Sequence, residues 1–148
     1  MLIFSESSLT FKSFPFPPSI NAAYSSFVRN GKLIRCKSPQ YVAFNKVFKE
    51  YEDVLGYDTP KAQDLIKRWF KFNSKTVLNI ECVFYDSRCF NKDGTIKKSD
   101  VFNRVKITHD KIADLLDIDD RFFWSGNTIR VPSKEHYVDI TVSPSQYL

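Results

Sequence analysis

The stretch of sequence that decides the fold runs from Thr76 to Tyr85 and reads TVLNIECVFY. Apolar and polar side chains alternate along it, so that one face carries Leu78, Ile80, Cys82 and Phe84. The other face carries Asn79 and Glu81. This period of two is typical of a half-buried strand. We therefore expect a sheet strand here whose apolar face, Cys82 included, fills the core.

Two helices are predicted on the amino-terminal side of this strand. The first begins at Ser38-Pro39, a capping residue followed by a proline in the first turn, and ends at Gly56. The second begins at Thr59-Pro60. Each carries an apolar stripe at helical spacing, which we expect to face the core. The stripes are Phe44, Val47, Phe48, Tyr51 and Leu55 in the first helix and Leu65, Ile66, Trp69 and Phe70 in the second.

Shorter strands are predicted before and after these helices. Residues 9–16 end at a Pro-Pro pair, and Asn30-Gly31 is a hairpin turn signal between residues 26–28 and 32–35. Residues 121–124, 128–131 and 137–142 also have an extended pattern. The order of strands and helices predicts an α+β fold, with a mixed β-sheet packed with about three helices.

Composition predicts one domain over residues 1–148. A chain of 148 residues, 43% hydrophobic and with 14 Phe, can form an aromatic-rich core unaided. No stretch approaches the roughly 18 apolar residues of a membrane span, and no signal pattern begins the chain. We therefore expect a cytoplasmic protein with no membrane partner.

Charge favours an anionic partner such as nucleic acid. The chain has 22 Lys and Arg against 17 Asp and Glu, a formal net charge of +5. Acids nevertheless crowd one segment, at Asp100, Asp110, Asp114, Asp117, Asp119 and Asp120. An acidic cluster in a basic protein suits a metal-dependent nuclease, because acids hold cations while Lys and Arg hold phosphates. The alternative is an acidic helix end without function.

A third helix, over about residues 100–116, is expected to carry the chemistry. Helical spacing places Asn103, Lys106, Asp110 and Asp114 on one narrow face. The opposite face carries Val105, Ile112, Ala113 and Leu116 and is expected to face the core. At the start of the helix, Asp100 can cap free backbone amides. The alternative for the polar face is solvated residues with ion pairs.

The adjacent carboxylates of Asp119 and Asp120 repel each other, and a divalent cation offsets that repulsion. Mg²⁺ takes one or two carboxylates and completes its shell with water and phosphate oxygen. If the loop after the helix folds back toward Asp100, these three acids can share a cation. Lys106 would then steady the phosphate or orient the attacking water.

Two motifs resemble the RusA family of Holliday junction resolvases. Residues 17–24 read PPSINAAY, similar to the family's Pro-Pro-Ser-x-Asn-x-x-Tyr. Residues 100–106 read DVFNRVK and are followed by Asp110 and by Asp119-Asp120, similar to the family's acidic motif. The two motifs stand in the family's order, and the resemblance covers nearly the whole chain.

The resemblance implies a RusA-like homodimer that cuts branched DNA, such as four-way junctions, in recombination and repair, within a bacterial or phage-infected cell. It implies that Mg²⁺ or Mn²⁺ is held by Asp100 and Asp120, with Asp119 as a ligand or its support. Lys106 would be catalytic or contact phosphate, and Asn103 would orient the site. DNA contacts are expected from Asn21, Tyr24, Lys98, Arg104, Arg121 and Lys134.

One position departs from the family pattern. Phe102 stands where the family usually has its second aspartate, and a phenyl ring cannot bind a metal. Helical geometry predicts that Phe102 faces the core. Water or another acid, with Glu81 and Asp86 as candidates, would complete the metal site, or the site would hold its metal weakly and still cut.

Two other functions remain open at this point. One is a catalytically silent protein that binds DNA junctions, in which the acids no longer serve catalysis. The other is a small basic protein with a protein partner, whose acids are only surface residues. The leading hypothesis is a metal-dependent endonuclease.

Overall fold

Strand β5 (Thr76–Asp86) belongs to a mixed sheet, and it forms where the alternation of the sequence predicts a strand. The computed structural model describes residues 1–98 and 102–146. On one side β5 pairs antiparallel with β8 (Tyr137–Gln146). On the other side it pairs parallel with β6 (Phe123–Ser125) and β7 (Thr128–Pro132). The predicted α+β fold with a mixed sheet is therefore confirmed.

Two strands extend the sheet beyond β8. Strand β2 (Leu9–Pro15) pairs antiparallel with β8, and β1 (Leu2–Phe4) pairs antiparallel with β2. The register of β2 shifts between Phe11 and Phe14, where Ser13 has a φ of 57°. Such a bulge bends the strand locally. Strand β1 was not predicted, because three residues are too few to show an alternation.

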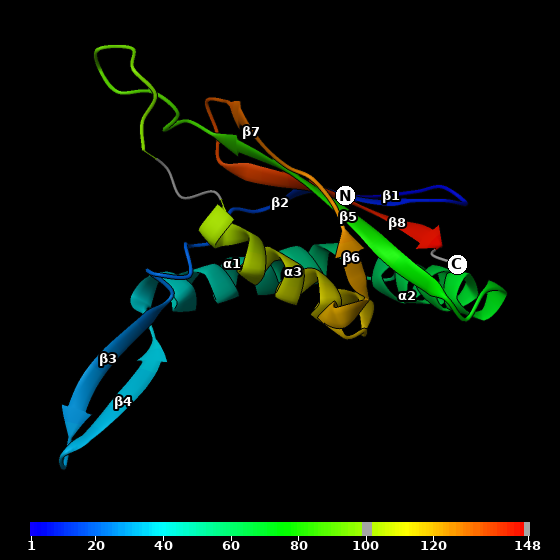
Figure 1. Ribbon diagram of the computed structural model, residues 1–148, viewed down its shortest axis with the longest axis horizontal. Coiled ribbons are helices and arrows are strands. Elements are labelled where there is room, and N and C mark those ends of the chain that lie inside the picture. Colours follow the sequence, from blue (N-terminus) through cyan, green and yellow to red (C-terminus); the bar gives the residue numbers. More distant parts are fainter. Residues whose placement is uncertain (99–101, 147–148) are drawn as a thin grey trace.

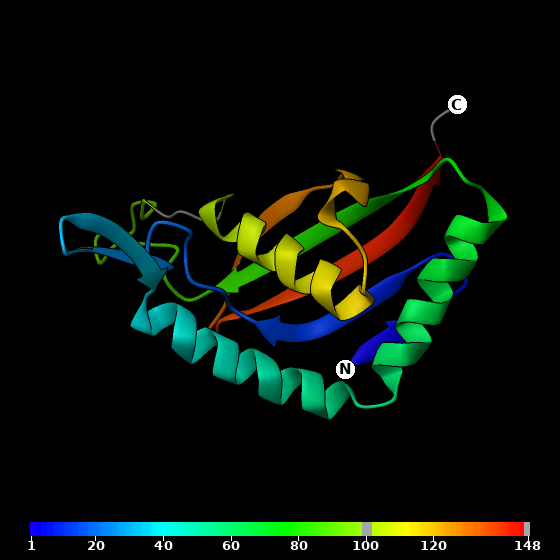
Figure 2. The same ribbon diagram turned by 90° about the horizontal axis from the view of Figure 1, so that it is seen from below.

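Helices α1 (Pro39–Leu55), α2 (Asp58–Phe72) and α3 (Phe102–Leu116) lie on one face of the sheet (Figures 1 and 2). The Ser38 hydroxyl caps α1 by accepting a hydrogen bond from the Tyr41 amide at 3.2 Å, as the Ser-Pro start predicts. Between the helices and the sheet lies an aliphatic and aromatic core that includes Phe14, Ile66, Phe84, Ile112 and Val142.

The predicted apolar stripes are largely in this core, except that Val47 is exposed and that Tyr51 and Phe70 are only half-buried. In α1, Phe44, Phe48 and Leu55 are buried, but Val47 is 49% exposed. In α2, Phe70 is only half-buried and packs against Phe122, with ring centroids 4.8 Å apart. Residues at the edge of an apolar stripe lie at the border of the contact between helix and sheet, so they are only partly covered.

Segment 121–124, expected to be extended, begins instead as a short 3₁₀ helix, η1 (Asp120–Phe122), and continues as β6. The interruption at Gly126 has a steric reason. A Cβ atom there would lie 1.8 Å from the carbonyl oxygen of Ile80, so the chain can pass this close to β5 only at a glycine.

Strands β3 (Tyr24–Arg29) and β4 (Lys32–Lys37) form a separate two-stranded hairpin that projects from the body (Figure 1). Asn30 and Gly31 both have positive φ, 52° and 73°, as a tight two-residue hairpin turn requires. The predicted hairpin is therefore confirmed, and it is longer than the sequence indicated. No helix in the described ranges is long and apolar enough to cross a membrane.

Candidate active site

The polar face of α3 is joined by the loop that follows the helix. Asp117, with a φ of 55°, ends α3, and the amide of Ile118 donates to the Ala113 carbonyl at 3.0 Å. This turn reverses the chain and brings Asp120 back beside the helix. Lys106 Nζ donates to Asp120 Oδ2 at 2.8 Å and to Asp110 Oδ1 at 2.9 Å. Two carboxylates thus converge on one ammonium group.

This cluster is open to solvent. Between 40% and 56% of each of the three side chains is exposed. Hydrogen bonds from Lys106 hold the pKa of Asp120 below its ordinary value, and those to Asp120 and Asp110 raise the pKa of Lys106. Exposed ion pairs add little to folding stability, so this cluster contributes little to holding the fold together.

Asp119 has a local structural role. Its Oδ1 accepts from the Arg121 amide at 2.9 Å and so caps η1. This capping fixes the backbone immediately before Asp120, which helps to orient the second carboxylate. The structure thus shows Asp119 as the cap of η1, and its role as a metal ligand or a support of one stays a prediction.

The two motifs that carry the family resemblance lie against each other. The amide of Ile20 donates to the Asn103 carbonyl at 2.8 Å, and the Arg104 guanidinium donates to the Pro17 carbonyl. Arg104 also lies over the Phe16 ring, 4.8 Å from its centroid. The amino-terminal loop is therefore fixed to the first turn of α3, about 80 residues away in sequence.

A cavity of about 540 Å³ extends from the acid cluster to the base of the β3–β4 hairpin. Tyr24 lies in its wall, with the Arg35 guanidinium 4.2 Å from its ring centroid and the Tyr41 ring 5.6 Å away. Lys106 and Asp110 line the same cavity. The expectation that Tyr24 contacts DNA stays a prediction. Sequence reasoning missed Arg35 and Tyr41, which meet Tyr24 only because the hairpin packs at the start of α1.

The other residues predicted to contact DNA are spread over the surface. Asn21 is exposed in the loop before β3, and Lys98 is exposed in the loop after β5. Arg121 lies in η1 near the start of β5, with its guanidinium 5.0 Å from the Phe122 ring centroid. Lys134 is exposed in the turn after β7, at the opposite end of β5. The structure does not bring Arg121 and Lys134 together.

Several predictions about the metal ligands are corrected or left untested. Asp100 lies outside the described residues. Phe102, expected in the core, is 76% exposed, because the first turn of α3 extends beyond the part of the helix that packs on the sheet. Glu81 cannot complete the site, since it alternates with Ile80 and Cys82 and so faces away from α3.

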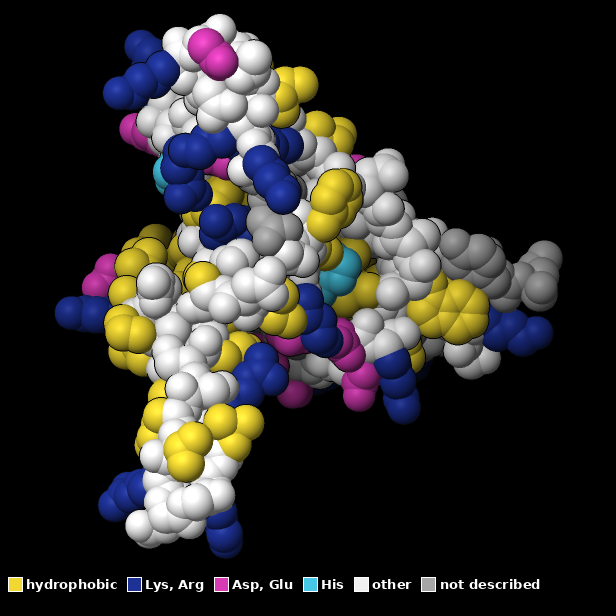
Figure 3. Space-filling view, turned by 60° about the vertical axis from the view of Figure 1, so that its left-hand side comes forward, with side chains coloured by type: hydrophobic (Ala, Val, Ile, Leu, Met, Phe, Trp, Pro, Cys, Tyr) yellow, Lys and Arg dark blue, Asp and Glu magenta, His cyan; other side chains and the backbone are white. Residues whose placement is uncertain are grey.

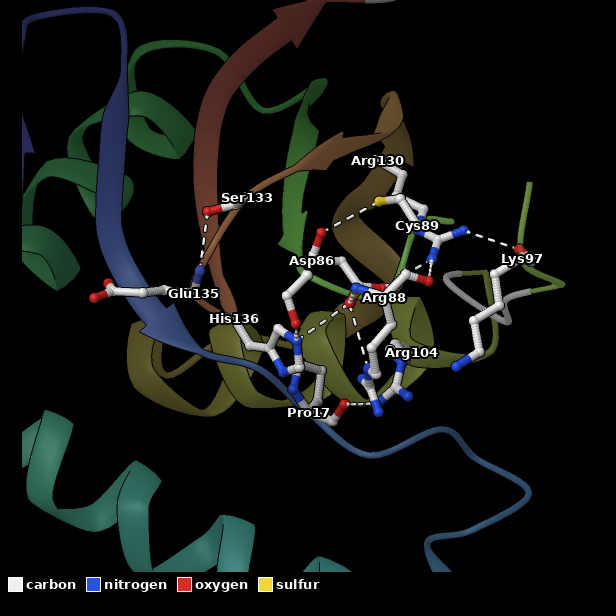
Figure 4. A network of polar contacts seen from close by, with 11 residues as sticks. Pro17, Asp86, Arg88, Cys89, Lys97, Arg104, Arg130, Ser133, Glu135 and His136 are labelled. Atoms are coloured by element: carbon white, nitrogen blue, oxygen red, sulfur yellow. Dashed lines mark hydrogen bonds and ion pairs between the residues drawn. The ribbon is translucent and has the colours of Figure 1, made fainter. Parts of the chain in front are cut away.

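Asp86, the other acid considered as a metal ligand, pairs instead with Arg88 and Arg130. It is buried at the end of β5, where it accepts from the Arg88 amide at 3.0 Å and from Arg130 Nη2 at 3.1 Å (Figure 4). Burial alone would raise the pKa of Asp86, but the Arg88 amide and the charges of Arg88 and Arg130 together hold it below its ordinary value.

The Asp86 network holds the loop of residues 87–98 in place. Arg130 donates to the carbonyls of Arg88 at 2.6 Å and Lys97 at 3.4 Å, and His136 Nε2 lies 3.3 Å from Asp86 (Figure 4). Sequence reasoning missed this network. The feature of the sequence that could have indicated this network is Asp86, an acid at the end of an apolar strand.

The acids of the Lys106 cluster can be compared with what a metal ion requires. Among residues 1–98 and 102–146, no three His, Cys, Asp or Glu side chains are grouped closely enough to hold a metal ion. Asp110 and Asp120 nevertheless present carboxylate oxygens, the donors that Mg²⁺ prefers, to one cation, the ammonium of Lys106. A two-carboxylate set fits Mg²⁺, which fills its other positions with water and phosphate.

A comparison with protein-family models gives no match for this chain, and a comparison with curated proteins gives none either. The resemblance to RusA resolvases therefore rests on the two motifs, which the structure places in contact through Ile20 and Asn103.

Proposed function

We propose that the protein is a metal-dependent, structure-selective endonuclease that hydrolyses phosphodiester bonds in branched DNA, as RusA-type resolvases do. The observation that carries the proposal is the convergence of Asp110 and Asp120 on Lys106, in an exposed cluster beside a basic hairpin. The sequence motifs implied Asp120 and Lys106 in these roles, and the fold-back of the loop after α3 supports it.

In this proposal Asp120 and Asp110 hold Mg²⁺ or Mn²⁺, together with Asp100 as the resemblance implies. The bound metal supplies an activated water and stabilises the charge that develops on the phosphate. Lys106 keeps the two carboxylates together and places its ammonium where it can contact a phosphate oxygen. The backbone carbonyl of Asn103 accepts a hydrogen bond from the Ile20 amide and so anchors the amino-terminal loop.

The proposal includes a homodimer, because two symmetric incisions in a four-way junction require two related sites. Each protomer would contribute one Asp110–Lys106–Asp120 cluster.

A second candidate function is a catalytically silent protein that binds DNA junctions. Two observations favour it. Phe102 stands at an exposed position where the resembling family has an acid, and Lys106 already forms ion pairs with both carboxylates. Binding would then rest on the shape of the junction and on contacts to its phosphates.

The experiment that tests the proposal uses a labelled four-way junction and a linear duplex of matched sequence. Both are incubated with the protein in Mg²⁺, Mn²⁺ or EDTA, beside the variants Asp120→Asn and Asp64→Asn. Asp64 is an exposed acid on α2 and serves as the matched control.

Paired, metal-dependent nicks in the junction that are lost in Asp120→Asn and kept in Asp64→Asn would support the nuclease. Tight junction binding without cleavage would favour the silent binding protein. A protein that neither binds nor cuts the junction would overturn both.

A further inference from the structure

The β3–β4 hairpin extends into solvent as a ribbon with exposed apolar side chains near its tip. Val28 and Leu33 face each other across the two strands and are 71% and 75% exposed. Phe27, on the other face of the ribbon, is 45% exposed. A two-stranded hairpin is only marginally stable in water by itself, so a partner that covers these side chains would stabilise it.

The charge of the ribbon indicates the kind of partner. Between Tyr24 and Lys37 the chain has four cationic residues and no acidic one, which is nearly the whole net charge of +5. The cationic residues are Arg29, Lys32, Arg35 and Lys37. Symmetric pairing with the ribbon of a second copy would bring like charges together, which is unfavourable. Duplex DNA instead offers about one negative charge per 1.7 Å.

The base of the ribbon is fixed next to the candidate active site. The Ser38 amide donates to the Ala23 carbonyl at 2.8 Å, and Lys37 Nζ lies 5.0 Å from the Tyr41 ring centroid. The cavity at this base is also lined by Lys106 and Asp110. A polymer bound along the ribbon is therefore held in a defined position relative to the acid cluster.

A second basic projection lies on the same side of the molecule. Figure 3 shows Lys and Arg side chains on both the hairpin and the loop of residues 87–98, with acidic side chains between the two projections. The loop contributes Arg88, Lys92, Lys97 and Lys98, all exposed. Cations on both sides of the acidic centre would hold a polyanion across it, and the metal ion of the proposed function would offset the repulsion between the acids and the phosphates.

We propose that the β3–β4 ribbon is a DNA-binding arm that enters a groove of the duplex. The major groove admits a two-stranded ribbon, and the ribbon's cations would contact phosphates, which fixes the position of the ribbon on the duplex. Val28 and Leu33, at the tip, make apolar contact with the bases. The inference rests on the proposed function in so far as that function makes DNA the partner.

The test compares charge and apolar variants of the ribbon in the full-length protein. Arg29→Gln/Lys32→Gln removes two charges at the tip, and Val28→Ser/Leu33→Ser removes the apolar pair. Lys61→Gln/Lys67→Gln removes two exposed charges from α2 as the matched control. Binding to a labelled four-way junction is measured in EDTA by fluorescence anisotropy across a salt series, after circular dichroism has shown that each variant is folded.

The charge variant should weaken binding and lower the slope of log affinity against log salt by about 2, because each lost phosphate contact removes about 0.9. The apolar variant should weaken binding roughly tenfold with the slope unchanged. The control should bind as the wild type does.

The outcomes separate the two proposals. If the wild type binds and cleaves the junction and both ribbon variants bind it with unchanged affinity, the DNA-binding arm is overturned and the proposed nuclease function is not. A wild-type protein that binds no junction would overturn both. Loss of a dimer in the ribbon variants, seen by sedimentation, would show that a second copy covers the ribbon, and would also overturn the arm.

Discussion

At the scale of single residues, Lys106 connects the two parts of the candidate site. Asp110 belongs to the same helical face one turn away, whereas Asp120 reaches it only after the chain has reversed at Asp117. The lysine therefore acts as a local cation that keeps two carboxylates side by side in spite of their repulsion. Removal of the lysine should therefore change the titration of Asp120.

Replacing Lys106 with Met should raise the pKa of Asp120. The substitution removes the hydrogen bonds that hold this pKa down and leaves the negative charge of Asp110 nearby. The measurement is a pH titration of the carboxyl carbons by NMR, with Lys61→Met as the control. An unchanged titration of Asp120 would show that the ion pair does not form in solution.

Replacing Phe102 with Asp should strengthen metal binding. The position is 76% exposed, so the change should alter the free energy of unfolding by no more than about 0.5 kcal/mol. A carboxylate there restores the acid found in the resembling family and adds a hard oxygen donor at the first residue of α3.

Mn²⁺ affinity by calorimetry and the rate of junction cleavage would be compared with those of a Phe102→Asn variant, which matches Asp in shape without its charge. A folded Phe102→Asp protein with unaltered Mn²⁺ affinity would argue against a metal at this end of α3.

At the scale of elements, the two projections differ in how they are held. The β3–β4 hairpin is a regular ribbon whose base is fixed by the contact of Tyr24 with Tyr41 and by the hydrogen bond from the Ser38 amide to the Ala23 carbonyl. The 87–98 loop has little secondary structure and depends on the ion pairs and hydrogen bonds of Asp86 and Arg130. Loss of Asp86 should therefore release the loop without disturbing the hairpin.

Replacing Asp86 with Asn should destabilise the protein by about 3 kcal/mol, because it leaves the partly buried Arg130 guanidinium without its charged partner. Urea unfolding of this variant and of the surface control Glu50→Gln would measure the difference.

The pH dependence should identify the same carboxylate. The pKa of Asp86 is lowered in the folded protein. The ionised carboxylate of Asp86 therefore stabilises the fold above the ordinary Asp pKa of about 4, and this contribution is lost as pH falls through the lower folded value. Asp86→Asn should lack this acid-dependent part of the stability. An identical loss on acidification in variant and wild type would contradict the assignment.

At the scale of the whole molecule, the helices cover one face of the sheet and leave the other face without a helical layer among the described residues (Figure 1). Polar and stacked side chains line that face, including the Tyr85 and Tyr137 rings with centroids 4.4 Å apart and the Lys12–Asp139 ion pair at 2.8 Å. The candidate site and both basic projections lie elsewhere, toward the end of the molecule where α3 begins.

The proposed function predicts a symmetric dimer in solution. Light scattering after size exclusion should give twice the chain mass of 17.3 kDa, and a dimer should place paired nicks in one junction before it dissociates. A monomer that makes only single nicks would remove the dimer from the proposed function.

Local features of this protein were determined by the sequence alone. The alternation of Thr76–Tyr85 predicted β5, Asn30-Gly31 predicted the hairpin, and Ser38-Pro39 predicted the start of α1. The polar face of α3 was also predictable, because helical periodicity relates residues three and four positions apart. Each of these features depends on neighbours within one or two turns of chain.

Only the tertiary structure decided which distant residues meet. It brought Asp120 back to Lys106, joined the PPSINAAY loop to α3 through Ile20 and Asn103, and buried Asp86 against Arg130. It also left Phe102 in solvent, where periodicity alone had placed it in the core. The physical reason is that periodicity gives the direction of a side chain around its helix, whereas the packing of other elements determines whether anything lies there.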